Sequence, residues 1–304
     1  MSEVFSPPSQ QSFLICHRGA LGDFILTWPA LRCLREVLPE YRFLGIGRAD
    51  HMRLAVKQGL LEAWLDMESA VLLDFFAGRM LPPVIGHPAG AVLWLSEGQH
   101  VVKRLEAVAD LPVVAISPFP AVSMHIARSY CATLSRYFPI RVPDNLTEGF
   151  PAPEISGSEA MIHPGSGSSQ KNYACRFYRT VCEELRHAGY PRVRVIVGPV
   201  EQERQMEQEF AGETVEQPDS VVQLADLLAT AALYIGNDSG VSHLAAILGV
   251  PAIALYKTTD PDIWGVLGRQ ATALVAHDEA SALSQIRAWL HQNTYLPSKE
   301  KKIP

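Results

Sequence analysis

The chain lacks several features that mark other classes of protein. Its 304 residues include five cysteines, and no two of them form a Cys-x-x-Cys pair. No apolar run approaches the ~18 residues expected of a membrane-spanning helix, and no cationic segment followed by an apolar core opens the chain. The net charge of -6 argues against nucleic acid as the main partner. We therefore expect a soluble, cytoplasmic protein whose thiols are reduced and mostly buried.

Two nucleotide-binding signatures are absent as well. The dinucleotide fingerprint Gly-x-Gly-x-x-Gly does not occur, because Gly19 and Gly22 give only Gly-x-x-Gly, and Gly165 and Gly167 lack a third glycine. The spacing of a P-loop is also missing. No His/Cys cluster with metal-ligand spacing stands out. These absences disfavour a redox Rossmann enzyme, and we expect neither a bound metal nor a cofactor.

The residues that are present favour a globular enzyme. Apolar residues make up 48% of the chain and charged residues 19%, a balance typical of folded enzymes. Apolar runs alternate with amphipathic segments, which is the pattern of a parallel sheet covered on both faces. The alternation stops over 141–157, a segment with several prolines and glycines that we interpret as a linker. We therefore predict two α/β domains, at 11–142 and 159–292, with parallel sheets facing across a cleft.

The same alternation predicts the individual elements. Strands are expected at 13–16, 42–47, 91–95, 113–117, 160–163, 193–197, 233–236 and 252–255. Helices are expected at 51–59, 99–109, 123–138, 173–187, 201–210, 220–231, 239–248 and 280–291. Ligands bind such sheets at the carboxyl ends of the strands, so the loops that follow the strands are the candidate functional segments.

A single carboxylate lies at the first of these loops. Gly19 and Gly22 form the bend after the opening strand, and Asp23 stands where a helix is expected to begin. Asp23 is therefore either a helix cap or a reactive group. Pro29 suits the first turn of a helix that starts nearer Thr27, which would release Asp23 from capping. We favour a chemical role for Asp23.

The loop from His163 to Lys171 has the composition of an anion-binding site. It combines glycines, hydroxyl side chains that include Ser166, and one lysine, and it lies between a predicted strand and a predicted helix. Backbone N–H groups and the helix end can bind a phosphate there. The alternative is an ordinary flexible βα loop, which we regard as the weaker interpretation.

A second candidate anion site follows the strand at 233–236. The amides of Ser239 and Gly240 would point outward at a helix start, and either Asp238 or Ser239 could cap that helix. His243, one turn further on, either reaches the same ligand or is a satisfied helix histidine. Glu201, in another strand-to-helix turn, either caps its helix or binds ribose hydroxyls, and its position favours the cap.

Taken together, these motifs resemble glycosyltransferase family 9, which contains the ADP-heptose lipopolysaccharide heptosyltransferases. The resemblance lies in Gly-Ala-Leu-Gly-Asp at 19–23, in the His-Pro-Gly-Ser loop that ends in Lys171, and in Gly-Asn-Asp-Ser-Gly-Val-Ser-His at 236–243. It implies a GT-B fold of two Rossmann-like domains, with the acceptor bound mainly by the first and the nucleotide-sugar by the second. It also implies an inverting, metal-independent transfer.

The resemblance further implies a role for each matched residue. Asp23 corresponds to the proposed general base of the family, Lys171 to its phosphate-binding lysine and Glu201 to its ribose-binding acidic residue. The diphosphate loop of the family falls on Asp238, Ser239, Gly240 and His243, with serine in place of the usual threonine. Asn-Tyr-Ala follows Lys171 where the family has x-Trp-Pro, a departure at the donor pocket.

These expectations lead to one main functional hypothesis and two alternatives. The main hypothesis is a glycosyltransferase that moves a sugar, heptose from ADP-heptose, onto a lipopolysaccharide core or related glycan. Such an acceptor would bring the protein into peripheral contact with the inner face of the inner membrane. The alternatives are a nucleotide-sugar epimerase on the same fold and a non-catalytic module that binds nucleotide-sugars.

Overall fold

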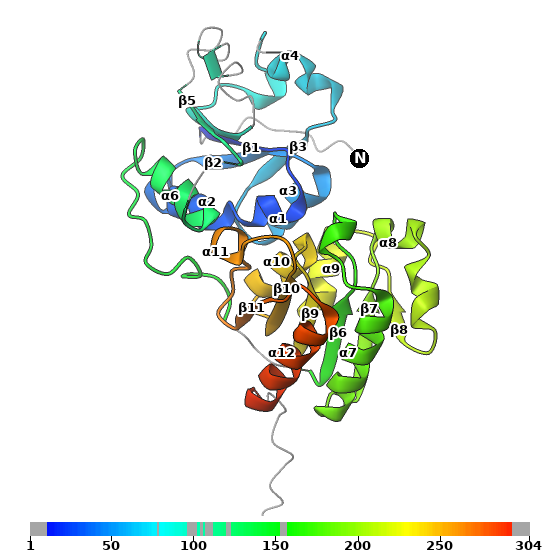
Figure 1. The fold of residues 1–304 in the computed structure, drawn as a ribbon. Helices are drawn as coiled ribbons and strands as arrows, with labels where there is room; N and C mark the ends of the chain where they lie inside the picture. Colours follow the sequence, from blue (N-terminus) through cyan, green and yellow to red (C-terminus); the bar gives the residue numbers. More distant parts are fainter. Residues whose placement is uncertain are drawn as a thin grey trace, which may run out of the picture. The chain divides into compact units, whose positions relative to one another are not determined.

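The computed structural model describes residues 11–77, 79–95, 102–103, 106, 112–119, 123–152 and 157–293. The chain divides into two compact units, Met1–Leu146 and Thr147–Pro304. The division falls inside the segment 141–157 that is rich in proline and glycine. Each unit is an α/β structure built on a parallel sheet (Figure 1).

The sheet of the first unit has the strand order β3-β2-β1-β4-β5 among the described residues, and all of its pairs are parallel. Its strands are β1 (Ser12–His17), β2 (Arg42–Gly47), β3 (Ala63–Asp66), β4 (Gly90–Trp94) and β5 (Val113–Ile116). The central strand β1 is buried along almost its whole length, as expected for a strand covered on both faces. Four of these strands lie where the sequence predicts them, and β3, whose residues are all half-buried, was not predicted.

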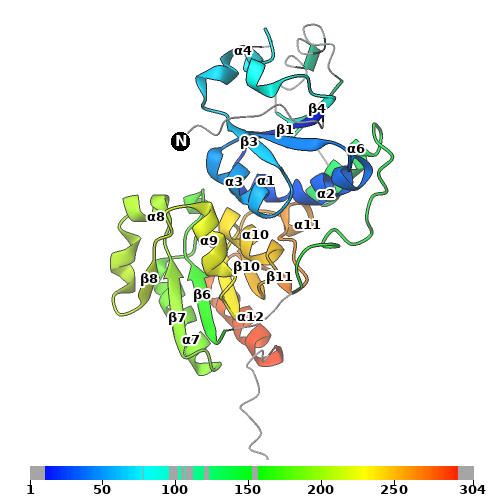
Figure 2. The ribbon, with the colours of Figure 1, turned by 180° about the vertical axis from the view of Figure 1, so that it is seen from behind.

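Helices cover both faces of this sheet (Figures 1 and 2). One face carries α1 (Leu21–Ile25), α2 (Trp28–Val37), α3 (Ala49–Lys57) and α6 (Ile126–Leu134). The other carries the 3₁₀ helices η1 (Ala70–Leu72) and η2 (Pro83–Ile85) and the short helix α4 (Leu73–Phe76). Leu14 and Cys16 of β1 belong to an apolar cluster with Phe75 of α4, so Phe13, Ile15 and His17 point to the opposite face.

The segment after β1 forms two helices, whereas one helix was expected to begin at Asp23. Thr27 is the residue before α2, and its hydroxyl donates to the carbonyl of Phe24 at 2.7 Å. The predicted helix start near Thr27, with Pro29 in the first turn, is confirmed for α2. Asp23 does not stand outside a helix, because it is the third residue of the separate five-residue helix α1.

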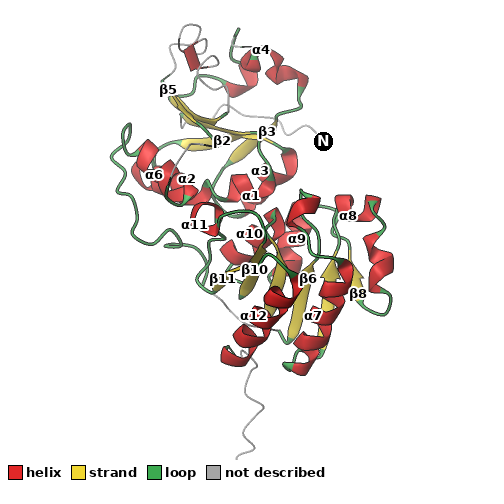
Figure 3. Cartoon of the chain, in the orientation of Figure 1, coloured by secondary structure: helices red, strands yellow, loops and turns green. Residues whose placement is uncertain are grey.

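The sheet of the second unit is also entirely parallel, with the described order β11-β10-β9-β6-β7-β8. Its strands are β6 (Glu159–His163), β7 (Arg192–Ile196), β8 (Thr214–Glu216), β9 (Leu233–Asn237), β10 (Ala252–Tyr256) and β11 (Ala271–Val275). On one face lie α7 (Cys175–His187) and α12 (Glu279–Gln292), whose apolar side chains share a cluster with β6, β7, β9 and β10. On the other lie α9 (Val221–Leu228) and α10 (Gly240–Ile247) (Figure 3).

Two helix predictions differ from the structure, and a third is not tested. The helix expected at 201–210 is two elements, α8 (Pro199–Glu203) and the 3₁₀ helix η4 (Met206–Phe210), because Gln205 has a φ of 55° in the left-handed region. The helix expected at 123–138 is confined to α6. The helix expected at 99–109 lies almost entirely outside the described residues. The edge strands β8 and β11 and the short helix α11 (Pro261–Trp264) were not predicted.

Strand order places a candidate binding edge in each unit. In the second unit, β6 and β9 are neighbours, but the chain proceeds from β6 toward β7 on one side and from β9 toward β10 on the other. In the first unit, β1 and β4 have the same relation, since β2 and β5 lie on opposite sides of that pair. Ligands bind open α/β sheets at such reversals of strand order. The predicted functional loops follow β1, β6 and β9, and thus lie at these points.

The cysteines agree with the sequence expectation. All five are free, and Cys16, Cys33, Cys131 and Cys182 are buried. Burial raises the pKa of the Cys16 thiol to about 12, although the nearby charge of Arg18 acts in the opposite direction. Among the residues that the structure describes, no helix combines the length and the apolar character needed to cross a membrane.

Candidate functional site

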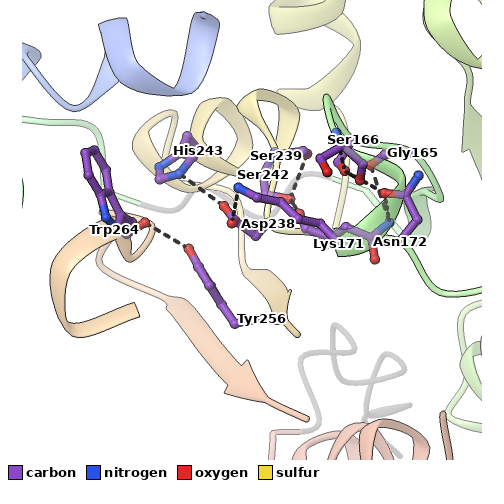
Figure 4. Close-up of polar contacts among 12 residues, drawn as sticks. Gly165, Ser166, Lys171, Asn172, Asp238, Ser239, Ser242, His243, Tyr256 and Trp264 are labelled. Atoms are coloured by element: carbon purple, nitrogen blue, oxygen red, sulfur yellow. Dashed lines mark hydrogen bonds and ion pairs between the residues drawn. The ribbon is translucent and has the colours of Figure 1, made fainter. Parts of the chain in front are cut away.

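Two predicted site residues meet at the reversal point of the second unit. Lys171 ends the short 3₁₀ helix η3 (Ser169–Lys171) after β6, and Asp238 directly follows β9. The Nζ atom of Lys171 lies 2.6 Å from Oδ2 of Asp238, an ion pair between residues 67 positions apart (Figure 4). Asp238 is almost fully buried, whereas the side chain of Lys171 is 33% exposed. The pair therefore presents the lysine to solvent and holds the carboxylate behind it.

The structure separates the roles of Asp238 and Ser239. Ser239 is the residue before α10, and its Oγ accepts the N–H of Ser242 at 3.4 Å. Ser239 is thus the cap of this helix, which leaves the carboxylate of Asp238 for Lys171. Gly240 opens α10, and the first amides of a helix have no carbonyl partner within it. They give this edge of the sheet a positive potential suited to an anion.

His243 lies beside Asp238, as the cluster in Figure 4 shows. Its Nε2 atom is 3.9 Å from Oδ1 of Asp238, and its side chain is almost fully buried. The carboxylate of Asp238 therefore has Lys171 on one oxygen and His243 near the other. These three residues meet only in the folded chain, because they come from η3, the end of β9 and the first turns of α10.

Ser166 shapes the loop that carries Lys171. Its buried hydroxyl lies 2.7 Å from the carbonyl of Ser168 and 2.5 Å from Oδ1 of Asn172, and it accepts the N–H of Ser168 at 3.3 Å. These contacts use the hydrogen-bonding capacity of the hydroxyl within the loop. In this arrangement Ser166 orders the loop, and the loop offers its backbone and Lys171 to a ligand.

Asn237 is a site residue that the sequence analysis did not single out. It is fully buried at the end of β9, and its Nδ2 donates to the carbonyl of Pro164 at 2.7 Å. Its Oδ1 accepts the hydroxyl of Tyr178 at 2.7 Å. Asn237 therefore ties the loop after β6 to the strand before Asp238. The sequence signal for Asn237 was its position between an apolar run and the Asp-Ser-Gly motif.

Glu201 acts as a helix cap in this structure, in line with the interpretation that its position favoured. It is the third residue of α8, and its Oε2 accepts the N–H of Gly198 at 3.0 Å. His163 Nε2 lies 3.5 Å from the same oxygen. Burial opposes ionisation of Glu201, but the hydrogen bond and charge of His163 and the N–H of Gly198 outweigh it, so the pKa of this carboxyl is lowered. Its side chain packs against Gly165, where an added Cβ would lie 1.9 Å from Oε1.

In the first unit, Asp23 lies at the carboxyl end of β1. It is a half-buried residue in the first turn of α1, and the residue before that helix, Ala20, provides no side-chain cap. Gly19 fits between two side chains, because an added Cβ there would lie 2.9 Å from Cε1 of His17 and 3.2 Å from Oδ2 of Asp23. Gly19 therefore allows the carboxylate and the imidazole to approach the same backbone position. Gly22 is the residue of α1 directly before Asp23.

The ends of β1 and β4 carry two buried ring nitrogens. His17 and Trp94 are register partners, and His17 Nδ1 and Trp94 Nε1 have no hydrogen-bond partner among the described residues. Burial lowers the pKa of His17 to about 3, and the nearby charge of His51 adds to this effect. His17 is therefore a neutral imidazole at physiological pH. The hydroxyl of Tyr130 donates to the carbonyl of Pro118, and the Tyr130 ring packs edge to face against Trp94.

The described residues contain no group of three or more His, Cys, Asp or Glu side chains arranged to hold a metal ion. The positive groups beside Asp238 include Lys171 and the start of α10. The structure thus offers a lysine and helix amides for an anion at one sheet edge, and a carboxylate beside a neutral histidine at another.

Comparison with known proteins relates these features to one family. Residues 121–289, more than half of the chain, match the family model described as glycosyltransferase family 9 (heptosyltransferase). Lipopolysaccharide heptosyltransferase 1 of Escherichia coli O18:K1:H7 is 30% identical over 139 residues. That alignment spans 45% of this chain and 42% of the length of the E. coli protein.

Solved structures share the fold of this chain. A glycosyl transferase family 9 structure from Veillonella parvula has a TM-score of 0.71 at 17% identity, over 94% of this chain and 92% of that one. E. coli heptosyltransferase WaaC with ADP has a TM-score of 0.69 at 19% identity, over 92% of this chain and 100% of that one. The fold predicted from the sequence, two Rossmann-like units of the GT-B type, is confirmed.

Proposed function

The chain belongs to glycosyltransferase family 9, and from this premise we propose that it transfers heptose from ADP-heptose onto a lipopolysaccharide core or a related glycan. The observation that carries the proposal is the anion site of the second unit, where Lys171 and Asp238 meet beside the start of α10. Support for the nucleotide comes from WaaC, whose structure contains ADP.

The second unit supplies the groups that a departing nucleoside diphosphate requires. The leaving ADP carries about three negative charges at neutral pH, and Lys171 and the amides at the start of α10 stabilise that charge. Asp238 holds Lys171 in place through the 2.6 Å ion pair. Because a lysine has three N–H donors, Lys171 retains donors for the phosphates. We propose that these groups do the work of a metal ion and that the reaction needs none.

The first unit supplies the base. A direct displacement at the anomeric carbon inverts its configuration and requires a group that accepts the proton of the acceptor hydroxyl. We assign this role to Asp23. His17, whose ring approaches the same position of Gly19 as this carboxylate does, is neutral. The proton leaves the acceptor oxygen as that oxygen bonds to the sugar, while the bond from the sugar to ADP breaks.

A direct assay tests this proposal. The purified chain is incubated with ADP-heptose, and separately with other nucleotide-sugars, with and without lipopolysaccharide truncated before its first heptose. We expect ADP release that depends on the acceptor, an acceptor product heavier by one heptose, and unchanged rates in excess EDTA. Isomerisation of the donor without acceptor would indicate an epimerase, and donor binding without any turnover would indicate a binding module.

The acceptor class also implies contact with a membrane surface, which we propose as peripheral binding at the inner face of the inner membrane. Co-sedimentation with vesicles that contain truncated lipopolysaccharide measures it. We expect binding that is lost when the glycan is removed from the vesicles. Equal sedimentation with both kinds of vesicle would contradict recognition through the glycan.

A further inference from the structure

A second lysine lies next to the anion site of the second unit. Lys257 directly follows β10, the neighbour of β9, and Leu255 of β10 is in register with Asn237 of β9. Its Nζ atom donates to the carbonyl of Asn172 at 3.4 Å, and Asn172 is the residue after Lys171. Lys257 thus contacts the loop after β6 at the residue next to Lys171.

Aromatic and backbone groups surround Lys257. Its Nζ lies 5.4 Å from the centroid of the Tyr173 ring, within the range of a cation–π contact. The Tyr173 ring stacks on Phe177 with centroids 4.7 Å apart, and its hydroxyl donates to the carbonyl of Ala276. The carbonyl of Lys257 lies 2.9 Å from Nδ1 of His277. These contacts place the ammonium group at this edge of the sheet.

The charges around the two lysines differ. The charge of Lys171 is matched by Asp238 at 2.6 Å. Among the residues that the structure describes, Lys257 forms no ion pair with a carboxylate, and its Nζ contacts a carbonyl and an aromatic ring. The acidic residues near Tyr173 are engaged elsewhere, because Asp278 caps α12 through the N–H of Ser281 and Glu279 pairs with Arg176.

This imbalance matters for a diphosphate. A group with two to three negative charges, about what a nucleoside diphosphate carries, gains less net attraction from a lysine paired with a carboxylate than from a lysine without such a partner. The ammonium group of Lys257, which contacts the carbonyl of the residue after Lys171, supplies additional charge, and its flexible stem allows it to follow a ligand. Only one of its three N–H donors is used by the carbonyl of Asn172.

We propose that Lys257 is a second phosphate-binding cation of this site and determines its preference for diphosphate ligands. The inference rests on the proposed function, because it takes the donor to be a nucleoside diphosphate sugar. Lys171 with Asp238 positions one phosphate group, and Lys257 leaves the face of Tyr173 to bind the other anionic oxygens.

The test compares Lys257→Met with the unchanged chain by calorimetric titration of ADP and by competition with inorganic pyrophosphate. Methionine keeps the packing of the stem and removes the charge. We expect about ten-fold weaker binding of both probes, equivalent to ~1.4 kcal/mol, and a shallower dependence of ADP affinity on salt. Lys257→Arg keeps the charge and is expected to restore most of the affinity. Lys57→Met, at an exposed position of α3, is the matched control and should bind like the unchanged chain.

The outcomes separate the two proposals. Unchanged affinity of Lys257→Met for ADP and pyrophosphate overturns this inference and leaves the proposed function standing. Weaker binding of ADP with unchanged competition by pyrophosphate also overturns it, because the side chain would then act on the nucleoside. If the unchanged chain binds neither probe, the proposed function fails and this inference with it. Lys257→Gln, judged by the same criteria, replaces the methionine variant if that variant does not fold.

Discussion

Acidification should destabilise the first unit through His17. The folded state holds this ring neutral, with its pKa lowered from 6.5 to about 3, first by burial and then by the charge of His51. An unfolded chain protonates the same ring near 6.5, so the unfolded state binds more protons between these two values. The stability contributed by the neutral ring is therefore fully present above pH 6.5 and is lost as the pH falls from 6.5 toward 3.

The magnitude follows from the size of the pKa difference. Each pH unit below 6.5 costs ~1.4 kcal/mol while the folded ring remains neutral, so about 2 kcal/mol is lost at pH 5. His51, whose pKa burial and the charge of Arg48 lower to about 4, adds a loss of the same order. The stacked rings of Phe24 and His51, 5.9 Å apart, and the contact of Phe24 with His17 mean that the two losses are coupled.

Urea denaturation at pH 7.5 and pH 5 measures this effect. The unchanged chain should lose several kcal/mol of unfolding free energy on acidification, and His17→Gln should lose about 2 kcal/mol less. His87→Gln, at an exposed position of the same unit, is the control and should behave like the unchanged chain. Equal acid sensitivity of His17→Gln and the unchanged chain would refute the buried, neutral state of His17.

Three further predictions concern the second unit. Gly165→Ala should lower the unfolding free energy by roughly 1–3 kcal/mol because its Cβ would overlap Glu201. In urea denaturation, the double variant with Glu201→Ala should recover part of that loss. Additive losses would argue against the contact. Ser239→Ala removes the cap of α10 and should lower the unfolding free energy by about 1 kcal/mol, and no change would argue against the capping role. Lys171→Ala should weaken ADP binding at least ten-fold in calorimetry, a size expected for a charge-assisted contact, and an unchanged affinity would remove Lys171 from the donor site.

The predictable part of the fold is the part with a strong apolar pattern. Strands such as β1, β9 and β10 are continuous buried runs, and their bounds lie within a residue or two of the expected ones. The strands β8 and β11 were missed because their residues are largely half-buried or exposed and carry no clear alternation. The break between α8 and η4 at Gln205 could not be predicted from the residue type, because only the surrounding structure forces a glutamine into the left-handed region.

The site shows a similar division. The loops after β1, β6 and β9 were predictable because small residues and charges follow apolar runs. The 2.6 Å pair of Lys171 and Asp238 was not, since it joins residues 67 positions apart. Lys257 gave no signal at all, because a lysine after a buried strand is common, and its relation to Asn172 and Tyr173 appears only in three dimensions.

The measurement that tests the central claim most directly is the effect of Asp23→Asn on acceptor-dependent ADP release and on ADP affinity. If Asp23 is the base and the second unit holds the diphosphate, the rate of release falls by at least ~100-fold, while the ADP affinity stays within a factor of two of the unchanged chain. Asp50→Asn, at the first turn of α3, is the control and should leave both unchanged. A near-normal rate for Asp23→Asn would contradict the account and leave Asp23 as a first-turn carboxylate of α1 without a chemical role.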